Sequence, residues 1–123
     1  MARIENVPGT CTGYIVIWRY KVDPAQEAKF AKAYGPKGEW VKFFSASKDY
    51  LGTELLADDE RPGEYVTIDR WESEESYSNF LGEHEADYDR LDRRFEALTL
   101  SESRVGAYGV AGQKKGSESF PTK

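Results

Sequence analysis

Cysteine and histidine are almost absent from this sequence, which contains one of each, Cys11 and His84. A single cysteine cannot form a disulfide within the chain. One histidine and one cysteine cannot build a transition-metal site by themselves. The chain also lacks the glycine-rich phosphate-binding motifs and the G-x-S-x-G motif. We therefore interpret Cys11 as a spectator and expect no metal site.

The sequence also lacks a surplus of positive charge and a long apolar run. It has 17 Lys and Arg against 22 Asp and Glu, which gives a formal net charge of −5. Binding to nucleic acid requires an excess of Lys and Arg on some face. No apolar run approaches the length of a membrane-spanning helix, and the first residues lack the core of a signal peptide. These features predict a cytoplasmic protein that binds neither nucleic acid nor a membrane.

Aromatic residues are abundant, with three Trp, eight Tyr and six Phe among 123 residues. A hydrophobic content of 39% excludes a disordered chain, and the length fits one domain. The aromatic side chains either fill the core of this domain or line a cleft for a flat ligand.

The pattern of apolar residues and turn residues predicts two helical regions and four strands. We expect strands over 14–22, 50–57, 64–71 and about 103–110, a helix from the Asp23 cap to Tyr34, a short helical piece over 38–44, and one long helix that begins after Ser73 and runs to about Leu98. Residues 1–12 are interpreted as an irregular lead-in, 13–110 as the domain and 111–123 as a flexible tail. The order β-α-β-β-α-β predicts an α+β, ferredoxin-like fold, in which both helices cover one face of a four-stranded antiparallel sheet.

The strands carry apolar groups on both faces. In the first strand Val16 and Trp18 point to one face, while Ile15 and Ile17 point to the other. Two helices can cover only one face of the sheet. A second copy of the chain, packed sheet against sheet, is the simplest cover for the other face. We therefore predict a homodimer, which would form a dimeric α/β barrel.

Two segments resemble the antibiotic biosynthesis monooxygenase (ABM) domain family. In the segment 65–80, Trp71 ends a strand, Ser73 caps the next helix, and the aromatic Tyr77 follows Trp71 by six residues. Segment 50–56, with Gly52 after an aromatic and an aliphatic residue, resembles the second strand of the family. The resemblance implies a dimeric α+β barrel with a pocket between helices and sheet in each subunit. It also implies oxygenation of an aromatic, polyketide or quinol-type molecule without metal or flavin.

The sequence departs from some branches of this family. The position nine residues after Trp71 is Phe80, where the quinol and haem-degrading branches often have His or Trp. Trp18 and Arg90 lie near the positions where the haem-degrading branch needs Asn and His. We therefore expect no haem and no other cofactor. The alternative is a non-catalytic dimeric module of the same fold that binds a small hydrophobic ligand.

His84 is the candidate catalytic residue, because it alone titrates near neutral pH and could take a proton from a phenol or carbon acid. Its alternative role is to fill a half-buried helix position. The candidate substrate-binding residues are aromatic: Trp18, Trp40, Phe44, Tyr77, Phe80 and Tyr88. Ordinary core packing is the alternative, favoured for Phe80. We also expect an Arg–Asp pair across the sheet, among Arg19, Asp69 and Arg70, or else an Arg that holds a ligand carboxylate.

Overall fold

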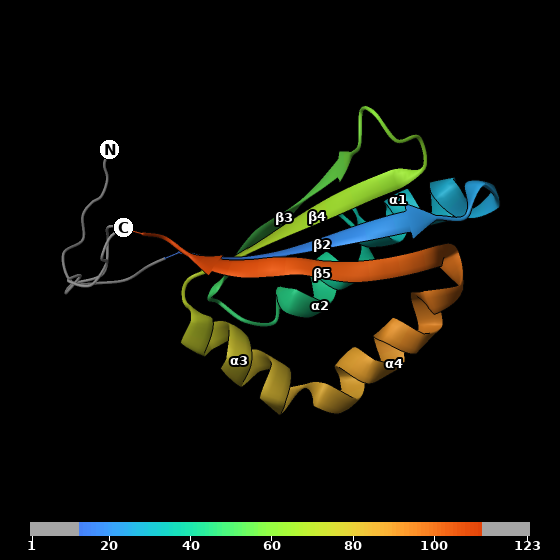
Figure 1. The fold of residues 1–123 in the computed structure, drawn as a ribbon. Helices are drawn as coiled ribbons and strands as arrows, with labels where there is room; N and C mark the ends of the chain where they lie inside the picture. The colour runs from blue at the N-terminus through green and yellow to red at the C-terminus, as the bar shows by residue number, and fades with distance from the viewer. Residues whose placement is uncertain (1–12, 112–123) are drawn as a thin grey trace.

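The computed structural model describes residues 13–111 (Figure 1). The predicted lead-in 1–12, Cys11 and the predicted tail from residue 112 onward lie outside the described residues. The elements along the chain are β2 (Tyr14–Val22), η1 (Pro24–Gln26), α1 (Glu27–Tyr34), α2 (Glu39–Phe44), β3 (Tyr50–Ala57), β4 (Glu64–Trp71), α3 (Glu74–Glu83), α4 (Glu85–Phe95), η2 (Glu96–Leu98) and β5 (Thr99–Gly109).

The four strands form one antiparallel sheet in the order β3-β4-β2-β5. The two central strands pair along their whole length, from Tyr14 opposite Trp71 to Lys21 opposite Glu64. The sheet order and the element order confirm the predicted ferredoxin-like α+β fold. β5 begins at Thr99, earlier than the expected start near Ser103, because only three residues of η2 separate it from α4.

Two helical regions begin at residues whose side chains accept hydrogen bonds from backbone N–H groups of the first turn, which have no partner within the helix. The Asp23 carboxylate accepts a hydrogen bond from the Ala25 backbone N–H at 3.0 Å, and Pro24 follows in the first turn. Ser73 and Ser76 cap α3 reciprocally, each side chain bonding the other residue's backbone N–H. Both starts confirm the caps expected from the sequence.

The single long second helix expected from the sequence is wrong, because the chain forms α3 and α4 with a break between them. The break lies at His84, whose backbone angles are φ −123° and ψ 29°. The break comes two residues after Gly82, a residue at which a helix bends easily. The direction of the chain therefore changes between Tyr77 and Tyr88, two residues that would otherwise share one continuous stripe.

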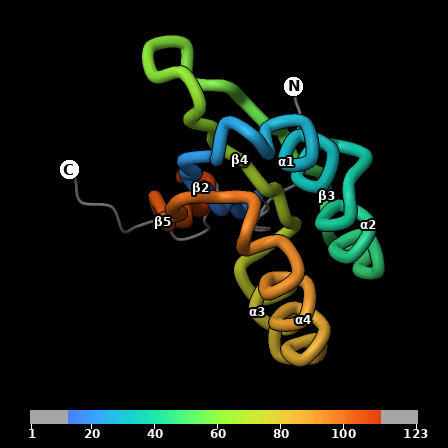
Figure 2. The backbone as a smooth tube through the Cα atoms, turned by 90° about the vertical axis from the view of Figure 1, so that its right-hand side faces the viewer, coloured from blue at the N-terminus to red at the C-terminus, as the bar shows by residue number. Residues whose placement is uncertain are grey.

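The core lies on one face of the sheet, under the helices. Trp71, Val22 and Tyr20 from the strands pack against Phe30 of α1 and Phe80 of α3. Trp71 and Phe30 are completely buried. Figure 2 shows α1 with α2 and α3 with α4 as two groups of helices. Both helical regions thus cover the same face, as the fold class requires.

The opposite face of the sheet carries no helix within the described residues and is apolar along its centre. Ile15 and Ile17 of β2 lie beside Ile68 of β4, and all three are half-buried by their neighbours in the sheet. Leu56 on β3 and Tyr108 on β5 extend this surface and are 46% and 50% exposed. Monomeric proteins seldom leave such a continuous apolar face open to water.

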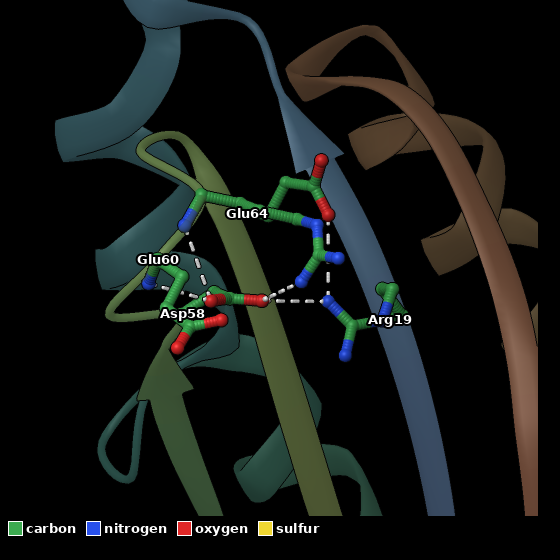
Figure 3. Close-up of polar contacts among 5 residues, drawn as sticks. Arg19, Asp58, Glu60 and Glu64 are labelled. Carbon is green, nitrogen blue, oxygen red and sulfur yellow. Dashed lines mark hydrogen bonds and ion pairs between the residues drawn. The ribbon is translucent and has the colours of Figure 1, made fainter.

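Arg19 belongs to this helix-free face. The Arg–Asp pair expected among Arg19, Asp69 and Arg70 is wrong, because Arg19 pairs with Asp58 and Arg70 pairs with Glu54. The Arg19 guanidinium donates to the Asp58 carboxylate at 3.0 Å and lies 3.4 Å from Glu64 (Figure 3). Asp58 also accepts from the backbone N–H of Glu60 at 2.9 Å. Arg19 lies opposite Val66, and Val66 and Asp69 are three residues apart on β4. Side chains alternate between the two faces of a strand, so Arg19 and Asp69 point to opposite faces of the sheet. This cluster fixes the β3–β4 turn.

Candidate functional site

A cavity lies between the helix-covered face of the sheet and the helices. It has a volume of about 40 Å³ for the centre of a water-sized sphere, and all four strands contribute to its wall. Its lining is Trp18, Tyr20, Tyr34, Trp40, Phe44, Thr53, Thr67, Asp69, Tyr77, Tyr88, Asp92 and Glu102. Seven of these twelve side chains are aromatic, and three are carboxylic acids. The cavity therefore combines flat apolar walls with groups that can accept a proton.

Asp69 of β4 is the carboxyl group that is best shielded from water in this cavity. Its Oδ1 accepts a hydrogen bond from the Thr53 hydroxyl at 2.6 Å. Within residues 13–111 no Arg or Lys forms an ion pair with it. Burial raises the pKa of Asp69 to about 6, and the bond from Thr53 lowers it only in part. A carboxyl group with this pKa is mostly ionised at neutral pH and is a stronger base than an ordinary aspartate.

A bulge in β3 places the partner of Asp69. Tyr50 lies opposite Trp71, but Gly52 already lies opposite Arg70, so Leu51 is an extra residue. Gly52 accommodates the bulge with φ at 133°, a conformation open mainly to glycine. Tyr50 and Thr53 consequently face the same side of the sheet. Strict alternation would have put them on opposite sides.

The bulge also creates a directed chain of hydrogen bonds. The Thr53 hydroxyl has one proton, which it donates to Asp69, so its oxygen must accept from the Tyr50 hydroxyl. Burial raises the pKa of Tyr50 to about 12, which keeps this phenol protonated at neutral pH. The chain holds one carboxylate oxygen of Asp69 in a fixed position. It leaves the other oxygen without a hydrogen bond from residues 13–111.

Two more carboxyl groups border the cavity, Asp92 of α4 and Glu102 of β5. Burial raises the pKa of each, and the negative charge of Glu96 raises both pKa values further. Asp92 is half-buried, whereas Glu102 is exposed. This part of the wall therefore favours a neutral or cationic group over a second anion.

The tyrosine hydroxyls around the cavity remain protonated at neutral pH. Burial raises the pKa of Tyr20, Tyr34, Tyr77 and Tyr88. The Tyr20 hydroxyl forms a hydrogen bond of 3.0 Å with the Thr67 hydroxyl, and Thr67 is buried. The other three can donate hydrogen bonds to an oxygen of a bound molecule.

His84 does not line the cavity. Its Nδ1 lies 3.0 Å from the Phe80 carbonyl oxygen, and its ring stacks on the Phe80 ring with centroids 4.2 Å apart. The helix break at His84 turns the imidazole toward Phe43 and Phe80. With the proton on Nδ1, the imidazole donates a hydrogen bond to this carbonyl oxygen. The catalytic role of His84 therefore stays a prediction for which the geometry gives no cavity contact.

The structure brings most of the other candidate residues together. Trp18, Trp40, Phe44, Tyr77 and Tyr88 border the cavity. Phe80 lies behind them, 3% exposed, and packs on Trp71. Sequence reasoning missed Asp69 as a lining residue, together with Thr53 and Thr67. The signal was present, because polar residues at positions 67 and 69 share a strand face with Trp71 and must point under the helices.

Among the described residues, no group of three or more His, Cys, Asp or Glu is arranged to hold a metal ion. Within the same part of the chain, no helix is both long enough and apolar enough to cross a membrane.

Comparison with known proteins identifies the family. The model of the family described as "antibiotic biosynthesis monooxygenase" matches residues 13–86, which include β2, β3, β4 and the start of α4. The chain belongs to the antibiotic biosynthesis monooxygenase family. No curated protein sequence matches it.

Several solved structures share the fold at low sequence identity. SnoaB, a cofactor-independent oxygenase from Streptomyces nogalater, is 19% identical with a TM-score of 0.59, and the match covers 80% of this chain and 93% of SnoaB. A putative antibiotic biosynthesis monooxygenase from Nitrosomonas europaea is 11% identical with a TM-score of 0.61, covering 91% and 100%. One from Bordetella bronchiseptica is 17% identical with a TM-score of 0.61, covering 79% and 95%. At these identities the likeness establishes the fold alone.

Proposed function

We propose that this chain is a cofactor-independent monooxygenase that acts on an aromatic, polyketide or quinol-type molecule bound between the helices and the sheet. The observation that carries the proposal is Asp69, a base of raised pKa inside an aromatic cavity. Family membership and the oxygenase activity named for SnoaB support the reaction class. The rings of Trp18, Trp40 and Tyr88 supply flat surfaces for a fused-ring substrate.

Asp69 would begin the reaction by removing a proton from an acidic C–H or O–H group of the substrate. The resulting anion delocalises over the ring system, and protonated tyrosine hydroxyls stabilise its oxygen atoms. One electron passes from the anion to O₂, and the superoxide and substrate radicals combine to form a carbon–oxygen bond. For a ring CH₂ group, cleavage of the O–O bond with loss of the second proton gives a carbonyl and one water. The substrate supplies all four electrons that reduce O₂.

The cavity is small for such a substrate, and this bears on a second candidate function. A volume of about 40 Å³ holds a few water molecules, so a fused-ring ligand requires Trp40 on α2 and Tyr88 on α4 to move apart. Their rings are in edge-to-face contact, with centroids 5.2 Å apart. The small volume of this cavity therefore favours a second candidate function, a non-catalytic dimeric module that binds a smaller hydrophobic ligand.

We also propose that the chain works as a homodimer, joined through the helix-free face of the sheet. This face carries Ile15, Ile17 and Ile68 at its centre, with Leu56 and Tyr108 beside them. A sheet-to-sheet contact that buries roughly 2,000 Å² would have the size of an obligate interface. Packing about a two-fold axis would cover the helix-free sheet face of both copies in one interface.

Oxygen uptake with a panel of anthrones and hydroquinones tests the proposal. Purified protein should consume O₂ faster than the spontaneous reaction with at least one of them, and Asp69→Asn should remove about 10²-fold or more of this rate. His84→Ala serves as the matched comparison, because His84 lies outside the cavity lining. No uptake above the spontaneous rate by the wild-type protein would favour the binding module. Loss in His84→Ala but not in Asp69→Asn would return the base to His84.

A further inference from the structure

A groove with basic rims runs over the outside of the helical layer, away from the cavity. Two adjoining hollows form it, of about 420 and 450 Å³, and both are bordered by Glu39, Lys42 and Arg94. α1 and α2 form one wall, and α4 with η2 forms the other. Figure 2 shows these two walls lying side by side. We call this feature the α2–α4 groove.

Positive charge is concentrated at the α2–α4 groove although the chain as a whole is acidic. The groove residues include six of the 17 Lys and Arg of the chain but only two of its 22 Asp and Glu. The cations are Lys29, Lys32, Lys37, Lys42, Arg90 and Arg94, and all of them are exposed. The groove therefore has a net charge of about +4 in a chain of net charge −5, and this contrast directs an anionic partner to it.

Four of these cations have no carboxylate partner in the described part of the chain. Lys42 pairs with Glu39 at 3.9 Å, and Arg90 pairs with Asp87. Within residues 13–111, Lys29, Lys32, Lys37 and Arg94 form no ion pair with a carboxylate. Their charges remain available to a partner that approaches the groove.

The floor of the groove is apolar. Phe43 and Leu91 lie in one hollow, and Phe95 and Leu98 lie in the other. The Arg94 guanidinium lies 4.8 Å above the ring of Phe95, so the cation and the floor form one surface. An apolar floor between two basic rims is complementary to an amphipathic helix with apolar residues on one stripe and carboxylates beside it.

We propose that the α2–α4 groove is a docking site for an acidic amphipathic helix of a partner protein. The extended shape supports a helix over a compact small molecule, because two hollows follow one another along α4. That helix has 11 residues and is about 16 Å long, which matches about three turns of a partner helix. The rims select the charge of the partner, and the apolar floor holds its Leu- or Phe-bearing stripe.

A synthetic 16-residue helical peptide, with Leu at helical spacing and Glu on both flanks, tests the proposal by isothermal titration calorimetry. It should bind the full chain, and binding should weaken steeply with added salt because the rim charges are exposed. Lys32→Glu combined with Lys37→Glu should weaken binding about 10-fold or more. The matched control is Lys21→Glu with Lys48→Glu, which reverses two exposed lysines outside the groove and should leave binding nearly unchanged.

Three results would overturn the proposal. The first is no binding of the acidic peptide, or equal binding of a peptide in which Lys replaces Glu. The second is equal weakening by the groove variant and the control variant while both retain the wild-type melting temperature. The third is binding of dodecyl phosphate at the groove without binding of the peptide, which would assign the groove to a small anionic amphiphile.

Discussion

Replacing Asp69 by Asn should make the protein more stable at pH 8 while removing its proposed base. The pKa of Asp69 rises from 3.8 to about 6 on folding, because burial disfavours the charged carboxylate. Well below pH 3.8 the carboxyl is protonated in both the folded and the unfolded state, and the pKa shift does not change the stability. As the pH rises from about 4 to about 6, the unfolded chain loses the proton first, and the folded state becomes progressively less stable. A shift of about 2 units corresponds to at most about 3 kcal/mol above pH 6.

Urea unfolding at pH 4.5 and pH 8 measures this effect. Asn can still accept the hydrogen bond from Thr53, so the variant loses the buried charge and keeps the local contact. Its advantage over the wild type should grow between the two pH values by about 1–3 kcal/mol. Glu54→Gln is the control, since Glu54 is an exposed carboxylate paired with Arg70 at 2.9 Å. An advantage of Asp69→Asn that does not grow with pH, or that shrinks, would refute the reasoning.

Three further predictions concern the same account. Thr53→Val removes the hydrogen bond that lowers the pKa of Asp69, so the pH midpoint of oxygen uptake should move upward; an unchanged or lower midpoint would count against the relay. His84→Ala should lower the free energy of unfolding by about 1 kcal/mol and leave oxygen uptake within about twofold, whereas complete loss of uptake would restore His84 as the base. Wild-type protein at micromolar concentration should elute as a dimer in size-exclusion chromatography and Ile68→Glu as a monomer; a monomeric wild type would refute the proposed interface.

The sequence predicted the fold well where local rules agree. The strands 14–22, 50–57 and 64–71 match β2, β3 and β4, because their β-branched and aromatic residues and the turn residues at 58–63 mark the same boundaries. Ser73 was correctly identified as a cap, since Ser is a strong cap residue before an apolar stripe.

The site was predictable only in part. Apolar spacing found Tyr77 and Tyr88, but one continuous helix was assumed, and the break at His84 depends on tertiary packing that spacing does not report. The bulge at Gly52 changes which residues of β3 face the cavity. One extra residue reverses alternation, so the partnership of Thr53 with Asp69 was not visible in the sequence.

Anaerobic titration with anthrone, followed by absorbance at pH 7, tests most directly whether Asp69 is the base. Without O₂ the reaction stops after proton removal, so a bound anion accumulates and can be seen at long wavelength. The wild-type protein should produce the anion band, and the band should disappear when added O₂ converts the bound anion to product. Asp69→Asn should bind anthrone in its neutral form and show no such band. An anion band of equal strength in both proteins, or none in either, would contradict the assignment of Asp69 as the base.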